Sequence, residues 1–273
     1  MTLAIQAVVF DWAGTVVDHG CIAPVLALRR VFAGAGVEIS EAEARADMGR
    51  AKRDHIRALL AMPRIAEAWR AGHGAAPTED DVNALHDAVE PMMRETGAER
   101  AVLIPGAERL ASLAERGIRI GSTTGYTRTM MADIAPRAAD QGYAPAVTVC
   151  AGETAVGRPS PLMMWKVLVE LAAWPAWACV KVDDSPVGIG EGRSAGAWTV
   201  GVAATGNGVG LDLAELNALE PYARRQRIDA AGAELISAGA NFVIDSVAEI
   251  GPVLDEITAR LARGERPGLD VRD

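Results

Sequence analysis

Two apolar segments of the sequence end in aspartates. Asp11 follows the run AVVF, and Asp183 and Asp184 follow the run CVKV. If both runs are strands of one parallel sheet, their carboxyl ends lie at the same edge of that sheet. Three carboxylates meeting there would repel one another unless a cation lay between them, and Mg²⁺ prefers such oxygen ligands. Each aspartate could instead simply cap the helix that follows it, so both interpretations stay open here.

Two further segments carry groups that could bind an anion. GSTTGYT, which includes Thr124, offers hydroxyl groups and backbone amides where a strand gives way to a helix. Arg158, in GRPSP, precedes another expected helix, and its guanidinium could neutralise a phosphoryl oxygen. Taken singly, the first segment is weak evidence, and an arginine such as Arg158 is more often a surface charge.

The elements that must position these residues are short apolar runs alternating with helix-like segments. Continuous apolar strands of this kind are typical of a parallel sheet covered on both faces. We therefore predict an α/β fold with a doubly wound, Rossmann-like parallel sheet. The expected strands are residues 7–11, 118–123, 146–150, 179–184, 198–203 and 241–245.

A long segment between the first two expected strands contains no convincing strand. It is far longer than the usual connection between neighbouring strands of such a sheet. Its periodicity is helical, Ser40 with Glu43 fits a capping box, and Thr78 with Asp81 indicates another helix start. We predict a catalytic core made of residues 1–19 and 101–273, with a helical cap inserted at residues 20–100.

Composition narrows the class of partner. A formal net charge of −9 and a pI near 5.1 leave no broad basic surface for nucleic acid or an anionic membrane, so we expect a small-molecule substrate. Cys21, Cys150 and Cys179 lack the spacing of a metal site or a disulfide framework. The first residues resemble a strand rather than a leader, and no apolar stretch approaches ~20 residues, so we expect a cytoplasmic protein.

Taken in chain order, these motifs resemble the haloacid dehalogenase superfamily. The matching positions are the strand-end Asp11, Thr124 after the second strand, Arg158 before a helix, and the acidic pair Asp183 and Asp184. The resemblance implies a core of this type with an inserted cap, and Mg²⁺ as the cofactor. It also implies that Asp11 attacks phosphorus and becomes an aspartyl phosphate, which is then hydrolysed.

Position 13 departs from the pattern of the superfamily's phosphatases. These usually carry a second aspartate two residues after the nucleophile, which protonates the leaving oxygen, but this chain has Ala13. The alanine could mean lost activity. It could also mean that the leaving group is carbon, because a carboxylic acid does little to stabilise a carbanion. A carbanion leaving group needs an electron sink, which an amine condensed with a neighbouring aldehyde supplies.

The chain has three lysines that could form such an imine: Lys52, Lys166 and Lys181. Lys166 lies in a helix-like segment and Lys181 inside an expected strand, so either could be structural. Lys52 lies in the expected cap, which could close over the core. Neighbouring Arg50 and Arg53 could lower its pKa.

Within the superfamily, the sequence resembles the phosphonatase family over most of its length. The matching segments are FDWAGTVVD, MGRAKRDHI, GSTTGYTR, GRPSP and KVDDSPVGIGEGRSAGAWTVGV. The resemblance implies hydrolysis of phosphonoacetaldehyde to acetaldehyde and phosphate, in the degradation of 2-aminoethylphosphonate. It implies Lys52 as the Schiff-base lysine and a homodimer formed through the cap. It also places further residues at the site: Met48, Gly49, His55, Tyr126 and Cys21.

The acidic motif differs from that of some family members, which carry Gly-Asp and a further aspartate four residues later. This chain has Asp183 and Asp184, followed by Gly188. We expect Asp11, Asp184 and the backbone carbonyl of Ala13 to bind Mg²⁺ directly, with Asp183 supporting Asp184.

Two other functions remain open on sequence grounds. A phosphatase or phosphotransferase acting on ordinary esters would keep its activity in Lys52→Ala. A binding protein without catalysis would tolerate Asp11→Asn.

Overall fold

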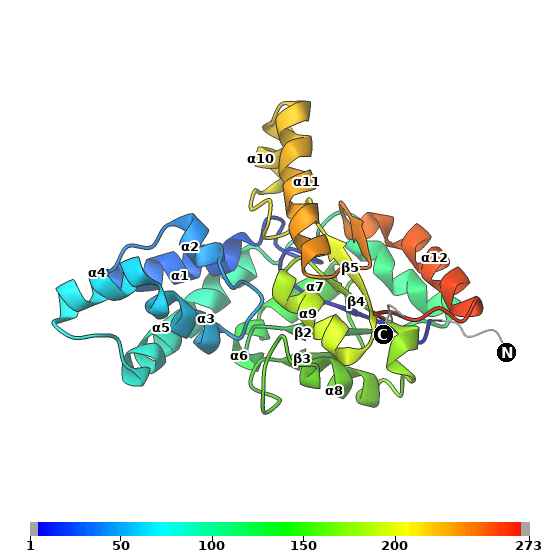
Figure 1. Ribbon diagram of the computed structural model, residues 1–273, viewed down its shortest axis with the longest axis horizontal. Coiled ribbons are helices and arrows are strands. Elements are labelled where there is room, and N and C mark those ends of the chain that lie inside the picture. Colours follow the sequence, from blue (N-terminus) through cyan, green and yellow to red (C-terminus); the bar gives the residue numbers. More distant parts are fainter. Residues whose placement is uncertain (1–4, 269–273) are drawn as a thin grey trace, which may run out of the picture.

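The computed structural model describes residues 5–268. Residues 1–4 and 269–273, the outermost parts of the predicted core, lie outside this range. The apolar runs form one parallel sheet in the order β3-β2-β1-β4-β5-β6, which confirms the predicted fold class (Figure 1). The strands are β1 (Ala7–Phe10), β2 (Arg119–Thr124), β3 (Val147–Cys150), β4 (Cys179–Asp183), β5 (Trp198–Val202) and β6 (Phe242–Ile244).

Helices cover both faces of the sheet. Alternate residues of each strand point to opposite faces, and since both sets are apolar, both faces must be covered. Val8 and Phe10 belong to one apolar cluster, and Ala7 and Val9 belong to the other. The first face packs against η1 (Ala107–Arg116), α7 (Ile134–Asp140) and α12 (Ile250–Ala262). The second packs against α8 (Leu162–Glu170) and α9 (Pro186–Ala195). The other core elements are α6 (Arg128–Met131), η2 (Ala176–Ala178), α10 (Leu213–Ala218), α11 (Pro221–Ser237) and η3 (Val247–Glu249).

Five helices lie between β1 and β2, in the segment predicted as the cap. They are α1 (Ile22–Gly34), α2 (Glu41–Arg45), α3 (Lys52–Ala61), α4 (Pro63–His73) and α5 (Glu79–Glu99). Figure 1 shows these five helices to the left of the sheet, whereas α10 and α11 project from the top of the core. The predicted capping box is present at Ser40 before α2, and the predicted helix start at Thr78 begins α5, where Thr78 and Asp81 also form a capping box. The domain boundaries at residues 19, 20, 100 and 101 stay a prediction.

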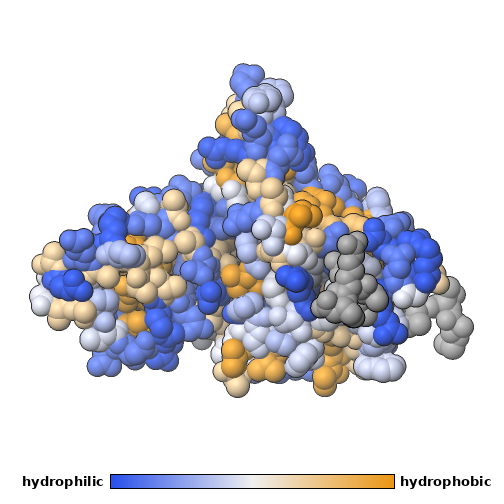
Figure 2. Space-filling model, in the orientation of Figure 1, coloured by the Kyte–Doolittle hydropathy of each residue, from blue (hydrophilic) through white to orange (hydrophobic). Residues whose placement is uncertain are grey.

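The visible surface is largely hydrophilic (Figure 2). Figure 2 shows hydrophilic residues over much of the visible surface of the cap and of α11. No helix within residues 5–268 is both long and apolar enough to cross a membrane. Cys21, Cys150 and Cys179 are all buried and unpaired, as their spacing predicts.

Candidate active site

The predicted acidic cluster forms where the strand order reverses, between β1 and β4. These strands are parallel neighbours, with Phe10 opposite Val182, so Asp11 and Asp183 emerge side by side. One oxygen each from Asp11, Asp183 and Asp184 lies within 4.8 Å of the others, and all three residues are buried. The open edge at such a reversal is where parallel α/β sheets bind their ligands.

The turn after β1 brings the backbone against this cluster. Gly14 has a φ of 82°, and a Cβ atom there would collide with the carboxylate of Asp184. Only glycine therefore allows so close an approach. Ala13, one residue earlier, lines the same cavity as Asp11 and Asp184 but adds no carboxylate to it.

The three carboxylates have different surroundings. Burial opposes the ionisation of Asp183, but the charges of Lys181 and Arg158 outweigh it and lower the pKa of Asp183. Burial, together with the charge of Asp183, raises the pKa of Asp11 to about 6. Burial and the charges of both neighbouring aspartates hold the pKa of Asp184 well above its ordinary value. Asp184 is thus the carboxylate that gains most from an added cation.

Buried charges at this edge do not balance among the described residues. Arg158 pairs with Asp11 at 2.8 Å and with Glu191 at 3.0 Å. Lys181 pairs with Asp183 and Glu191, each at 3.1 Å. With Asp184 included, four carboxylates face these two cations, and Lys52 across the cavity adds a third positive charge, so the carboxylates remain in excess. A divalent cation fits that excess, and the all-oxygen donor set suits Mg²⁺.

Arg158 is also fixed from the second strand. Its Nη2 donates to the carbonyl oxygen and to Oγ1 of Thr123, both at 2.6 Å. Burial disfavours its charge, but Asp11 and Glu191 hold the pKa of Arg158 above its ordinary value. Beside it, Thr124 Oγ1 accepts a hydrogen bond from the backbone N–H of Tyr126 at 3.1 Å, which leaves the hydroxyl proton available for a ligand.

Lys52 reaches the cavity from the first residue of α3. It is 2% exposed, and its Nζ lies 5.2 Å from the centre of the Tyr126 ring and 3.9 Å from Met48 Sδ. Burial is the main cause that lowers the pKa of Lys52 to about 8, helped by the charge of Arg158. The expectation that Arg50 and Arg53 do this is wrong: Arg50 pairs with Asp47, and Arg53 with Glu79.

The other two lysines lie elsewhere. Lys166 is 39% exposed on α8 and pairs with Glu170 at 3.4 Å. Lys181 is fully buried, where its Nζ donates to Thr123 Oγ1 at 2.7 Å as well as pairing with two carboxylates. Its amine is therefore already committed, and Lys52 alone of the three lines the cavity of Asp11.

The cap approaches the core closely around this cavity. A Cβ atom on Gly49 would collide with Ser185 Oγ, and one on Gly125 would lie 2.5 Å from the carbonyl oxygen of Arg50. The enclosed space is only about 20 Å³. It is lined by residues from both parts of the chain: Asp11, Ala13, Cys21, Met48, Gly49, Lys52, Thr124, Gly125, Tyr126, Arg158, Asp184 and Ser185.

Two predicted site residues do not line this cavity. Asp183 lies behind it, among the cations. His55 is fully buried in α3, where burial and the charge of Lys52 lower its pKa to about 3, so it is neutral. Two further residues of the site, Ser185 and Glu191, were not predicted from the sequence. The backbone N–H and Oγ of Ser185 both donate to Asp183 Oδ1. Glu191 is fully buried. The only signal for this network was a lysine inside an otherwise apolar strand, Lys181.

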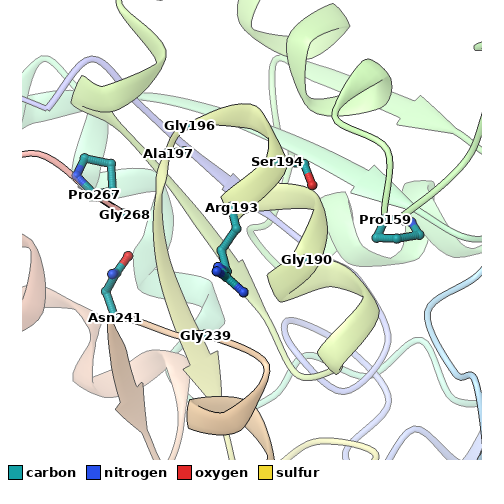
Figure 3. Close-up of a pocket in the computed structure, with 10 residues that line it drawn as sticks. All are labelled: Pro159, Gly190, Arg193, Ser194, Gly196, Ala197, Gly239, Asn241, Pro267 and Gly268. Atoms are coloured by element: carbon teal, nitrogen blue, oxygen red, sulfur yellow. The ribbon is translucent and has the colours of Figure 1, made fainter. Parts of the chain in front are cut away.

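A larger cavity offers no comparable chemistry. It measures about 480 Å³ and lies along α9 and the segments before β5 and β6 (Figure 3). Among the described residues that line it, Arg193 alone is charged, and its Nη1 donates to the carbonyl oxygen of Ala238. The smaller cavity between cap and core, which brings Asp11, Asp184, Lys52 and Arg158 together, is the candidate active site.

This fold and acidic site define a haloacid dehalogenase-like hydrolase, and the model of that family matches residues 5–196. The chain is 51% identical to the phosphonoacetaldehyde hydrolase of Paraburkholderia xenovorans, over 96% of this chain and 99% of the relative. It is 50% identical to that of Paraburkholderia phytofirmans, with the same coverage. A crystal structure of a phosphonoacetaldehyde hydrolase-like protein from Oleispira antarctica superposes with a TM-score of 0.96 at 43% identity, covering 97% of each chain. The chain therefore belongs to the phosphonoacetaldehyde hydrolase family.

The space at Gly188 provides a test of the acidic cluster. A Cβ atom on Gly188 would occupy the position of the Asp183 carboxylate. We expect Gly188→Ala to push Asp183 off Ser185 and Lys181, and to lower the free energy of unfolding by about 1–3 kcal/mol in a urea titration.

Gly251→Ala is the matched control, because a Cβ atom there meets nothing within 4 Å. An aspartate at position 188 could place its carboxylate in the same space. The double variant Asp183→Gly with Gly188→Asp should therefore be more stable than either single variant. If Gly188→Ala unfolds like the wild type, the close packing of Asp183 is wrong.

Proposed function

We propose that this chain hydrolyses the carbon–phosphorus bond of phosphonoacetaldehyde to acetaldehyde and phosphate. The relatives' names supply the substrate, and one observation in the structure carries the mechanism. A buried amine of lowered pKa, Lys52, faces the same cavity as Asp11, while position 13 has no acid. This is the combination required by a carbon leaving group that must be stabilised by an imine.

The first step belongs to Lys52. Its neutral amine attacks the aldehyde carbon, and loss of water gives a protonated imine one carbon away from the carbon–phosphorus bond. Burial of Lys52 keeps a share of the amine neutral near pH 7, about a tenth at one unit below its pKa. The face of the Tyr126 ring, 5.2 Å from Nζ, offers a surface that tolerates the cationic imine.

The second step belongs to Asp11. Its carboxylate attacks phosphorus, the carbon–phosphorus bond breaks, and the electron pair moves into the imine to give an enamine on Lys52. Arg158, 2.8 Å from Asp11 Oδ1, orients the carboxylate and offsets charge on the phosphoryl group. When bound by Asp11, Asp184 and the Ala13 carbonyl, with Asp183 supporting Asp184, Mg²⁺ would reduce the repulsion between the two anions.

Two hydrolyses complete the cycle. The enamine gains a proton on carbon, and water then releases acetaldehyde and regenerates the Lys52 amine. A second water cleaves the aspartyl phosphate, releasing phosphate and restoring Asp11. We propose Thr124 as a hydroxyl donor to the phosphoryl group. Cys21, Met48 and Gly49 line the space around the imine, and His55 supports it from within α3.

The setting of the reaction is proposed from the same resemblance. It comprises the degradation of 2-aminoethylphosphonate, a cytoplasmic location and a homodimer formed through the cap. Sedimentation equilibrium of the purified chain tests the dimer.

Trapping with borohydride tests the two covalent steps separately. With phosphonoacetaldehyde, wild-type enzyme should acquire an N-ethyl group on Lys52, because the carbon–phosphorus bond is cut before reduction. Asp11→Asn should instead retain an N-phosphonoethyl group on Lys52, because the imine forms without a nucleophile for phosphorus. Intact mass followed by peptide mapping distinguishes the two adducts.

Lys52→Met should give neither adduct nor phosphate, and the half-exposed Lys166→Met should behave as the wild type. Label on Lys166 or Lys181, or phosphate release that survives Lys52→Met, would overturn the imine mechanism. The ester phosphatase would then be the better explanation.

The rate of adduct formation should depend on pH through Lys52. With a pKa of about 8, the neutral fraction of the amine rises about tenfold per unit below pH 8 and levels off above it. Quenching the single-turnover reaction at intervals between pH 6 and 10 measures this. A rate that still climbs tenfold per unit above pH 9 would mean an unperturbed lysine.

Stability gives an independent check on the same shift. Since the folded pKa of Lys52 lies below the ordinary 10.5, the unfolded chain binds more protons between about pH 8 and pH 10.5. The wild type should therefore gain stability relative to Lys52→Met as pH rises across that window.

A further inference from the structure

We propose that Arg45 of the cap and Asn207 of the core act together as positioning residues for Asp184, so that cap closure and the metal site are coupled. The relevance of this coupling to phosphonoacetaldehyde hydrolysis rests on the proposed function, whereas its effect on metal binding does not. Asn207 lies in the loop between β5 and α10, a glycine-rich segment for which the sequence suggests no task.

Arg45 ends α2 and extends its guanidinium out of the cap into the core. Its Nη1 donates to the carbonyl oxygen of Gly20 at 2.9 Å and to Asn207 Oδ1 at 3.2 Å. Its Nη2 donates to the carbonyl oxygen of Gly210 at 2.8 Å. The side chain is 13% exposed, and Glu41 is its partner within the cap. We call these contacts the Arg45 junction.

The core also donates a hydrogen bond to the cap. Asn207 Nδ2 donates to the backbone carbonyl oxygen of Arg45 at 3.2 Å, so the two residues hold each other through side chain and backbone. A Cβ atom on Gly210, whose φ is 69°, would lie 2.7 Å from Arg45 Nε. The loop can therefore accept the guanidinium only with glycine at this position.

The same loop forms one wall of the acidic cluster. The backbone N–H of Asn207 donates to Asp184 Oδ2 at 2.8 Å, opposite the bond from Thr15 Oγ1 to Oδ1. A Cβ atom on Gly206 would collide with that of Asp184. Thr205 Oγ1 donates to the carbonyl oxygen of Gly14, in the turn after β1. Moving this loop therefore moves a hydrogen-bond donor of Asp184.

The junction also includes the linker that enters the cap. The backbone N–H of Gly20 donates to the carbonyl oxygen of Thr205 at 2.8 Å, so linker, loop and α2 meet at Arg45. The cavity measures only about 20 Å³, the space of about one water molecule, so the proposal includes a movement of the cap that admits the phosphonate. Such displacement would break the contacts of Arg45 with Asn207 and Gly210, and closure would restore them.

Metal affinity without substrate is the primary test, with Mn²⁺ as the probe and calorimetry as the measurement. Residues that orient a metal ligand typically change metal affinity by 10–100-fold. We expect Arg45→Met and Asn207→Ala each to weaken Mn²⁺ binding by about tenfold. Asn207→Ala keeps the backbone N–H to Asp184, so its effect reports on the contact with Arg45. Arg45→Lys should recover part of the loss.

Arg64→Met is the matched control. Arg64 is another arginine of the cap and is half exposed. Among residues 5–268, its hydrogen bonds go only to Glu43 and to the carbonyl oxygen of Glu38, both within the cap. Its substitution should leave Mn²⁺ affinity unchanged. The double variant Arg45→Met with Asn207→Ala should be no weaker than the weaker single variant, because coupled residues are not additive. Thermal melts of every variant separate this effect from misfolding.

The outcomes distinguish the two proposals. Unchanged Mn²⁺ affinity in both single variants, additive losses, or a wild type that binds no Mn²⁺ would each overturn the positioning role. If the single variants bind Mn²⁺ more weakly but the wild type does not hydrolyse phosphonoacetaldehyde, the positioning role stands and the proposed function is wrong. If both hold, kcat should fall in the two single variants while Arg64→Met keeps the wild-type value.

Discussion

The mutual repulsion of three buried carboxylates is the constraint on which the rest of this site depends. Parallel pairing of β1 with β4 forces Asp11, Asp183 and Asp184 together at the strand ends, so the sheet itself creates the repulsion. Arg158 and Lys181 offset part of this repulsion, but both also pair with a fourth carboxylate, Glu191. The remaining negative charge suits the edge to a divalent cation, and in the proposed mechanism that cation would in turn favour a phosphoryl group there.

The cap contributes the opposite electrostatic problem, a lysine kept away from water. Burial of Lys52 disfavours its ammonium form, which costs stability but yields a nucleophilic amine. The same enclosure places that amine against Tyr126 and Met48, over the core carboxylates. In the proposed mechanism, the Lys52 amine stabilises the leaving group, a task that an acid at position 13 would perform in an ester phosphatase. The proposal therefore explains Ala13 and Lys52 together, although they lie 39 positions apart in the sequence.

The features readable from the sequence are those that depend on local pattern. Strand positions were predictable to within one or two residues because buried parallel strands are continuous apolar runs. The helix starts at Ser40 and Thr78 were predictable because the capping residue and its partner are always three positions apart. The cause of the lowered Lys52 pKa was not predictable, because it is burial by the core rather than a neighbour in sequence. The roles of Glu191 and Asn207 arise the same way, from segments far apart in the chain whose approach leaves no periodic signal.

The close packing around Asp183 suggests how one carboxylate position could be reached from two different residues. The Asp183 carboxylate fills the volume that a side chain on Gly188 would need, and Ser185 holds it there with two hydrogen bonds. A chain with glycine at 183 and aspartate at 188 could deliver a carboxyl group to the same place from the helix instead of the strand. The two arrangements differ in sequence but present Lys181 and Arg158 with the same charge. The departure of this motif from other family members is therefore compatible with an unchanged site, since the cations require a carboxylate in that volume and not from a particular residue.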